Sequence, residues 1–170
     1  MKFGIVIFPS KKMQDYANSF RKRYDAHYAL IPPHVTLKAG FEATEEEIGP
    51  ITKKISAIAG NLNPVQLKVT KFSSFSPVNN VIYLKVEPSQ ELENLHNKLN
   101  AAFDNIQEYK FVPHVTLGQD MSDAEHADVY GTMRMNNINF EETADRIHLL
   151  YQLENGSWTV YETFRLGKDA

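Results

Sequence analysis

The 170-residue sequence contains no cysteine and one tryptophan. The absence of cysteine excludes disulfides, thiolate metal sites and catalysis by a thiol, and it fits a reducing compartment. No apolar run is long enough to span a membrane, and the short N-terminal run FGIVIF lacks the length of a signal-peptide core. We therefore expect a cytoplasmic protein that does not enter a membrane.

Neither sign of charge dominates the chain, whose net charge is -3 and whose pI is about 6.1. Proteins that grip long nucleic acids usually carry a strong basic excess. We therefore expect no DNA partner, and an anionic ligand that is small or held locally. A chain of this length suits one domain or two small lobes that share a core.

The pentapeptide PHVTL occurs twice, at residues 33–37 and again at 113–117. Each copy stands in the same order of predicted elements: an apolar strand, an amphipathic helix, PHVTL, a second helix and a further strand. The first strand of each half begins at Phe3 or at Val81, so it precedes Pro33 or Pro113 by nearly the same length of chain. This agreement in order and register indicates an internal duplication.

Capping residues mark the starts of the predicted helices, and a hairpin closes the chain. A serine or threonine precedes each apolar stripe at helical spacing. The predicted N-caps are Ser10, Thr44, Ser89 and Ser122. Residues 146–154 and 157–166 alternate like strands around Asn155-Gly156, which predicts a β-hairpin with a type I′ turn.

These elements predict an α+β fold of two pseudo-symmetric lobes, each with an antiparallel-rich sheet and helices, around a central cleft that carries the two motifs. The chain, 1–170, is expected to form a single bilobal domain. The first lobe would span about 1–76 and the second about 77–170, with exchange of a strand between the lobes allowed. No linker rich in Gly, Ser or Pro separates them, and residues 72–80 are the one candidate hinge.

The repeated motif places its polar groups together. In a strand, alternate residues share a face, so the histidine and threonine of each copy point one way and the valine and leucine the other. If an approximate twofold axis relates the lobes, His34 and Thr36 face His114 and Thr116 across the cleft. Two imidazoles and two hydroxyls then converge on one spot.

This set of groups suits in-line displacement at phosphorus. Because the ordinary histidine pKa is about 6.5, one imidazole can accept a proton while the other donates one, and each transfer is worth roughly 10²–10⁴ in rate. Threonine hydroxyls can hydrogen-bond the non-bridging phosphate oxygens. The scheme needs no metal or cofactor. A metal site built on His34 and His114 would lack its usual third ligand, because no carboxylate stands beside either motif.

Two H-x-T-x motifs, one in each half of a duplicated α/β chain of this size, resemble those of the two-histidine (2H) phosphoesterase superfamily, which includes the LigT-like 2′-5′ RNA ligases and cyclic phosphodiesterases. The stretch HVTLKAG at residues 34–40 is similar to the first LigT-like motif, and the chain is most similar to the YjcG group of phosphoesterases. The resemblance implies metal-independent action on a 2′,3′-cyclic or related phosphate at a nucleotide or RNA end.

The same resemblance implies roles for four residues. His34 and His114 would be the catalytic acid and base, with His34 as the proton donor, and Thr36 and Thr116 would bind phosphate. The pseudo-symmetry of the sequence leaves the order of the two histidines open. The alternative function is a non-catalytic module that binds an RNA end or a nucleotide in the same cleft. A third possibility, an interaction scaffold, leaves the four convergent polar groups unexplained.

The sequence departs from the family pattern after the second motif. Relatives that process RNA often carry a basic residue there, whereas this chain has Gly118-Gln119. Lys38, directly after the first motif, is expected to share the face of His34 if its strand continues regularly.

The remaining histidines, aromatic residues and basic residues are expected to be structural. His148 is predicted as a half-exposed strand residue, His96 as a boundary residue of its helix, and residues 20–24 as a basic solvated face. Four phenylalanines near the motifs or the hinge are candidates for stacking on a nucleobase, although a core position suits each of them better. These are Phe41, Phe72, Phe75 and Phe111. The sequence identifies neither the physiological substrate nor the oligomeric state.

Overall fold

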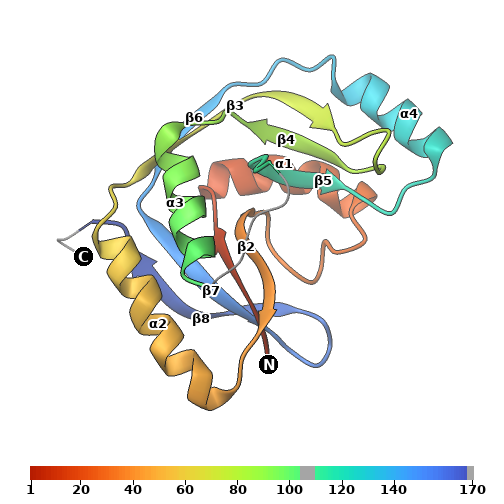
Figure 1. Ribbon diagram of the computed structural model, residues 1–170. Coiled ribbons are helices and arrows are strands. Elements are labelled where there is room, and N and C mark those ends of the chain that lie inside the picture. Colours follow the sequence, from red (N-terminus) through yellow and green to blue (C-terminus); the bar gives the residue numbers. More distant parts are fainter. Residues whose placement is uncertain (104–109, 168–170) are drawn as a thin grey trace.

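The computed structural model describes residues 1–103 and 110–167. Within these ranges the chain forms eight strands and four α-helices (Figure 1). In chain order they are β1 (Lys2–Ile7), α1 (Lys11–Tyr24), β2 (Val35–Glu42), α2 (Glu45–Gly60), β3 (Val65–Ser74), β4 (Ile82–Val86), α3 (Gln90–Ala101), β5 (His114–Gly118), α4 (Asp123–Met133), β6 (Phe140–Ala144), β7 (Arg146–Gln152) and β8 (Trp158–Arg165). The predicted order of strand, helix, strand, helix, strand therefore occurs twice before the final hairpin.

Each helix begins where its capping residue predicts. The side-chain oxygen of each predicted N-cap accepts the backbone N–H of the residue three positions later. At α2 the Thr44 hydroxyl accepts from Glu47 N at 3.2 Å, and the Glu47 carboxylate accepts from Thr44 N at 3.0 Å. This reciprocal pair is a complete capping box, and it satisfies two backbone donors that the helix leaves unpaired.

All eight strands join in one antiparallel sheet with the order β6-β3-β4-β5-β2-β1-β7-β8. The α+β class is therefore confirmed. The two strands that follow the PHVTL prolines, β2 and β5, are neighbours at the centre of the sheet, where Val35 pairs with Val115. This single pair joins two four-stranded halves.

One half of the sheet contains strands from both repeat units. β3, from the first unit, pairs with β4 and β6 of the second, whereas the hairpin β7-β8 pairs with β1. One strand of the first unit thus lies in the half of the sheet that holds the second unit. A division of the chain at about residue 76 stays a prediction.

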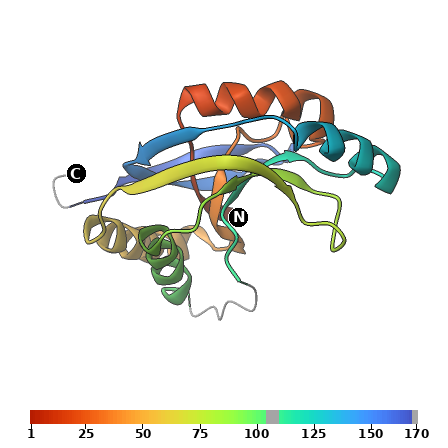
Figure 2. The ribbon, with the colours of Figure 1, turned by 90° about the horizontal axis from the view of Figure 1, so that it is seen from above.

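The core lies between the sheet and the helices. Seen from above, α1 and α4 lie toward one side of the molecule and α2 and α3 toward the other (Figure 2). α1 packs against β5, α2 against β8 and α3 against β2. Apolar side chains from strands of both halves are fully buried beneath them, including Ile5, Ile7, Leu67, Leu84 and Leu149.

The turn of the final hairpin differs from the predicted type I′. That turn needs a positive φ at both central residues, but only Gly156 has one, at 89°. Gly156 N donates to Leu153 O at 2.9 Å, and Leu153 N donates to Ser157 O at 2.7 Å. The loop is therefore a three-residue connection, residues 154–156, that ends in a left-handed glycine.

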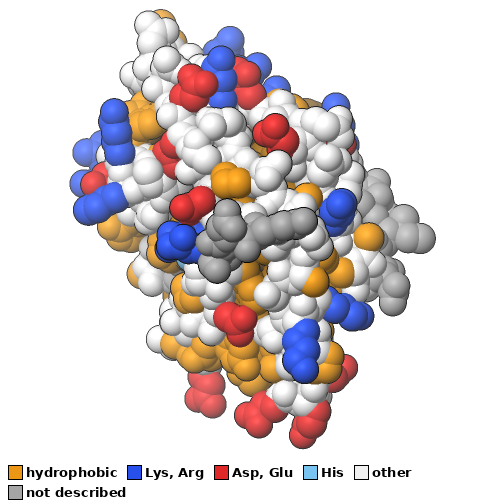
Figure 3. All heavy atoms as spheres, turned by 90° about the vertical axis from the view of Figure 1, so that its left-hand side faces the viewer, with side chains coloured by type: hydrophobic (Ala, Val, Ile, Leu, Met, Phe, Trp, Pro, Cys, Tyr) orange, Lys and Arg blue, Asp and Glu red, His pale blue; other side chains and the backbone are white. Residues whose placement is uncertain are grey.

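The surface carries both signs of charge. On the face shown in Figure 3, basic side chains are spread over the surface rather than gathered in one patch. Among the residues that the structure describes, none of the helices has the length and apolar character that a bilayer crossing would need.

Candidate functional site

The centre of the sheet brings the two motifs together. Val35 and Val115 are paired in antiparallel strands. Continuing this register by one residue on either side places His34 opposite Thr116 and Thr36 opposite His114. Residues directly opposite each other in such a pair have Cβ atoms about 5 Å apart. The four polar residues therefore share one face of the sheet, while the two valines are fully buried on the other.

A cavity of about 260 Å³ opens on this face. His34, Thr36 and Thr116 line it, so three of the four predicted site residues form its wall. His114 is not among the lining residues. Its ring packs against Phe75 and Tyr83, with ring centroids 5.1 Å away in each case. The fourth predicted residue therefore lies beside the cavity, supported by two aromatic rings.

Both histidines are oriented by the same hydrogen bond. His34 Nδ1 lies 2.9 Å from the carbonyl oxygen of Pro32, and His114 Nδ1 lies 2.7 Å from that of Val112. A carbonyl oxygen can only accept, so each Nδ1 carries the proton. Each neutral ring then keeps Nε2 as an unprotonated acceptor. The two repeats thus agree in atomic detail as well as in sequence.

The surroundings of the two imidazoles favour their neutral forms. Burial lowers the pKa of His34 to about 4, against the opposing effect of the Pro32 carbonyl. The charges of Arg21 and His114 lower the pKa of His34 further, while Asp25 raises it. Burial also lowers the pKa of His114, again against its backbone hydrogen bond. In the free protein near neutral pH, both rings are therefore proton acceptors.

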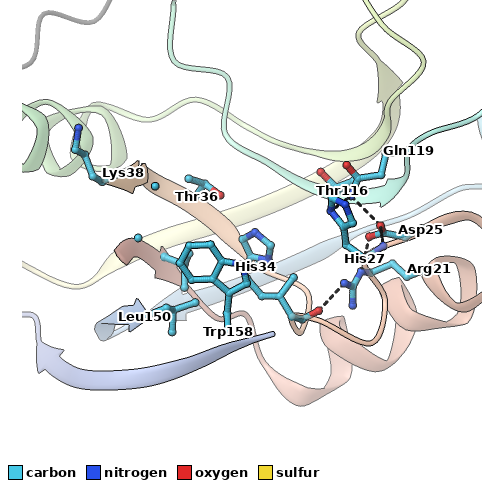
Figure 4. Close-up of a pocket in the computed structure, with 14 residues that line it drawn as sticks. Arg21, Asp25, His27, His34, Thr36, Lys38, Thr116, Gln119, Leu150 and Trp158 are labelled. Atoms are coloured by element: carbon cyan, nitrogen blue, oxygen red, sulfur yellow. Dashed lines mark hydrogen bonds and ion pairs between the residues drawn. The ribbon is translucent and has the colours of Figure 1, made fainter. Parts of the chain in front are cut away.

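A buried ion pair stands at one end of the cavity (Figure 4). Arg21, 2% exposed, donates from Nε to Asp25 Oδ2 at 3.1 Å and from Nη2 to the carbonyl oxygen of Ile31 at 2.6 Å. The prediction that residues 20–24 form a solvated face is therefore wrong for Arg21. The guanidinium instead ties the end of α1 to the segment that leads to His34.

Gln119, which follows the second motif, completes this network. Its Nε2 donates to Asp25 Oδ1 at 2.8 Å and lies 3.1 Å from His27 Nδ1. The amide of Gln119 therefore links the second motif to the segment before the first. Of the residues in this network, only Gln119 could be connected to the site from the sequence, because it follows the second motif. Asp25 and His27 had no such signal, because their partner Gln119 lies 94 and 92 residues away, and the role of Arg21 depends on the fold of the segment that leads to His34.

Lys38 lines the same cavity as His34 and Thr36, although the strand that carries it is not regular (Figure 4). Ile5 pairs with Lys38, but Val6 pairs with Thr36, so one residue of β2 is left over at a register shift. Such a bulge breaks the regular alternation of side chains. The Lys38 ammonium lies over the ring of Phe103, 5.3 Å from its centroid. The strand therefore does not continue regularly, yet Lys38 still contributes to the wall of the cavity.

The four candidate phenylalanines are structural. Phe41 packs between Phe3 and Phe103, and Phe111 stacks on His96. Phe72 is 5% exposed, and Phe75 packs against His114. None of them lines the cavity, whose aromatic wall residue outside the histidines is Trp158.

The described ranges contain no group of three or more His, Asp or Glu residues that could hold a metal ion. Neither motif threonine is hydrogen-bonded through its hydroxyl to another residue in the part of the chain that the structure describes. Both hydroxyls are therefore open to a ligand in the cavity.

Comparison with known proteins identifies the family of this chain. The model of the 2′-5′ RNA ligase superfamily matches residues 8–156. The chain belongs to this superfamily. A relative from Geobacillus sp. (strain WCH70), which carries a provisional phosphoesterase name, is 62% identical over 168 residues, 98% of this chain and 97% of its own. The membership makes this protein a phosphoesterase of the LigT type.

Solved structures agree with the fold. E. coli LigT in complex with phosphate superposes with a TM-score of 0.73 at 18% identity, over 98% of this chain and 97% of its own. E. coli LigT in complex with 3′-AMP gives a TM-score of 0.72 at 17% identity, over 98% of each chain. At this identity the likeness shows that the LigT-type phosphoesterases share this fold.

Proposed function

We propose that this LigT-type phosphoesterase opens 2′,3′-cyclic or related phosphates at nucleotide or RNA ends, with His34 and His114 as general acid and base. The observation that supports this most is the matched pair of Nδ1–carbonyl hydrogen bonds. They leave an unprotonated Nε2 on the histidine of each motif, and the threonine hydroxyls of both motifs line the cavity, where they can bind phosphate. E. coli LigT binds phosphate and 3′-AMP, which favours the same ligand class here.

The two imidazoles would account for both proton transfers of the reaction. One neutral imidazole takes a proton from water or a ribose hydroxyl as its oxygen bonds to phosphorus. The other, protonated, gives its proton to the departing ribose oxygen as that P–O bond breaks. Because burial keeps both rings neutral in the free site, the acid must gain its proton together with the substrate, whose negative charge favours imidazolium. Family resemblance assigns the acid role to His34.

The threonines would hold the phosphate during this step. Thr36 and Thr116 line the cavity from opposite strands, so each hydroxyl can donate to a non-bridging oxygen. Extending the register of the Val35–Val115 pair by one residue supports a pairing of each hydroxyl with the imidazole of the other motif. Charge that develops on the phosphate oxygens is then stabilised where it forms.

Hydrolysis of 2′,3′-cyclic nucleotides in EDTA tests the proposal, with the wild type, His34→Ala, His114→Ala and His148→Ala. His148 is a matched control, because it pairs with Val6 in the same sheet but does not line the cavity. We expect turnover to fall by at least about 10² in the first two variants and to persist in the third. Activity retained by either motif variant contradicts the mechanism.

The same experiment addresses the non-catalytic alternative. A binding module would show no turnover in the wild type, would bind 3′-AMP, and would keep much of that affinity in one of the two motif variants. A bell-shaped pH dependence of turnover would be expected only of the enzyme.

A further inference from the structure

The single tryptophan of the chain lies in the wall of the cavity. Trp158 is the first residue of β8 and pairs with Gln152 of β7 in the final hairpin. Its backbone N–H donates to the carbonyl oxygen of Leu30 at 2.8 Å, in the segment that leads to His34. The hairpin and this segment together fix the indole beside the first motif.

A glycine in β1 makes room for the indole. A Cβ built on Gly4 would lie 3.8 Å from the Trp158 ring atom Cζ3 and 3.5 Å from the carbonyl oxygen of Lys38. These are ordinary contacts, so alanine would fit there, but any longer side chain would enter the space that the ring occupies. Gly4 also lines the cavity. Because position 4 of β1 is a glycine, the indole of Trp158 can occupy this space beside the first motif.

The ring of Trp158 is available to a ligand. The other aromatic residues of the hairpin pack elsewhere: Tyr161 meets Phe3 at 5.5 Å and Tyr151 at 5.8 Å. Within the described ranges no aromatic ring packs against Trp158, which is only partly buried. Its neighbour on the same strand, Val160, is 45% exposed. A role in the hydrophobic core therefore does not account for the position of the indole.

The two sides of the cavity differ in character (Figure 4). Trp158 and Leu150 give one side of His34 an apolar surface, with Lys38 toward the same side of the view, and the network of Arg21, Asp25, His27 and Gln119, with Thr116, stands on the other. A nucleotide has the same division, since its base offers flat apolar faces while its ribose and phosphate carry hydrogen-bonding groups. Aromatic side chains bind bases through these faces.

We propose that Trp158 is the platform on which the base of the substrate stacks, so that the substrate class is a nucleotide or the terminal nucleotide of an RNA rather than a cyclic phosphate without a base. This inference rests on the proposed function, because it places the phosphate of the same ligand between the two motifs. Stacking tolerates every base and favours the larger ring systems, so purines are preferred over pyrimidines.

Binding measured by tryptophan fluorescence and calorimetry tests this role, since Trp158 is the only indole of the protein. The ligands are 3′-AMP, adenosine and inorganic phosphate. The variants are Trp158→Ala, Trp158→Phe and, as a control, Tyr161→Ala, which removes an aromatic ring from the same strand but outside the cavity lining. Circular dichroism checks that each variant folds.

We expect 3′-AMP and adenosine to quench the fluorescence of the wild type. Affinity for 3′-AMP should fall on the order of 10- to 100-fold in Trp158→Ala, recover in Trp158→Phe, and stay unchanged in the control. Affinity for inorganic phosphate should be the same in all variants. For cyclic nucleotides, Trp158→Ala should raise KM more than it lowers kcat.

Unchanged 3′-AMP affinity in Trp158→Ala overturns the platform while leaving the phosphoesterase proposal intact. The proposed function would fail differently: the wild type would neither bind inorganic phosphate nor turn over cyclic nucleotides. Adenosine quenching that disappears in His34→Ala, with phosphate binding retained, would also overturn the platform, because the base would then depend on the imidazole rather than on the indole.

Discussion

At the scale of single residues, the proline of the pentapeptide has a defined role beside each histidine. It separates His34 from the Pro32 carbonyl and His114 from the Val112 carbonyl that orient the rings. The ring of a proline fixes the residue's own φ and so restricts the backbone between the carbonyl and the imidazole. The repeated Pro-His unit therefore helps to orient the imidazole in both motifs.

Phosphate should raise the pKa of His34. In the free protein, burial lowers this pKa to about 4. A bound phosphate anion favours the protonated ring, so the pKa rises on binding, and by linkage the affinity for phosphate increases as the pH falls toward the bound-state pKa. NMR titration of the ring signals, with and without inorganic phosphate, measures the shift. His148, outside the cavity lining, is the internal reference, and equal titration of His34 in both samples contradicts the prediction.

Acid should destabilise the folded protein partly through His34. Between pH 6.5 and about 4, an unfolded chain protonates this histidine and the folded chain does not. Unfolding then takes up a proton, so the free energy of unfolding falls as the pH falls through this window. His34→Gln removes the titrating group. Urea unfolding at pH 7 and pH 5 should show a smaller loss of stability in this variant, and equal losses in variant and wild type would argue against a depressed pKa.

At the scale of secondary-structure elements, α1 contains two ion pairs of the same spacing with different environments. Arg21–Asp25 is buried, with 3% and 2% of the side chains exposed, whereas Lys11–Asp15 is 87% and 64% exposed. Arg21→Met leaves the Asp25 carboxylate buried without its partner, which costs about 3–5 kcal/mol. Lys11→Met should change stability little. Chemical denaturation of both variants measures the difference, and similar losses contradict it.

Arg21 should also affect turnover, because it binds the carbonyl of Ile31 three residues before His34. A positioning role predicts that kcat falls in a mild variant such as Arg21→Lys at temperatures where the protein remains folded. Lys11→Met should keep the wild-type rate. A normal kcat in folded Arg21→Lys would show that the segment before His34 is held without the guanidinium.

Local signals predicted the elements well, because caps and periodicity act within a few residues. All four N-caps and both repeat units follow from the sequence. Two expectations failed because they depend on packing with other elements. His96, expected at the border of the apolar stripe of its helix, is 3% exposed because it stacks on Phe111, and a bulge against β1 interrupts the strand that carries Lys38. Pairing between strands far apart in sequence leaves no mark on periodicity.

The site was partly predictable for the same reason. The repeated motif identified His34 and Thr36 as residues of one face, and likewise His114 and Thr116, since strand alternation is local. Trp158 and Arg21 had no comparable signal, because their places in the cavity depend on how the hairpin and α1 pack against the centre of the sheet.

At the scale of the whole molecule, the duplication alone does not complete the sheet. Each repeat unit supplies three strands, but β3 and β6 both lie in the half that contains β5. Read outward from the centre, one half is β5, β4, β3, β6 and the other is β2, β1, β7, β8. The hairpin therefore occupies in one half the positions that β3 and β6 occupy in the other. It also brings Trp158, so the symmetric motifs receive an asymmetric aromatic wall on the side of His34.

Because the site is built from both halves of the sheet, ligand binding should protect both motifs. Hydrogen exchange with and without saturating 3′-AMP should slow in residues 33–37 and in residues 113–117, since binding stabilises the folded state by about 2.7 kcal/mol at a ligand concentration about 100 times Kd. α2, residues 45–60, contributes nothing to the cavity lining and should exchange at an unchanged rate unless it opens only by global unfolding. His34→Asn should abolish protection of both segments together. Protection confined to one segment would mean that the ligand contacts one motif alone, and the two histidines could not then act on the same phosphate.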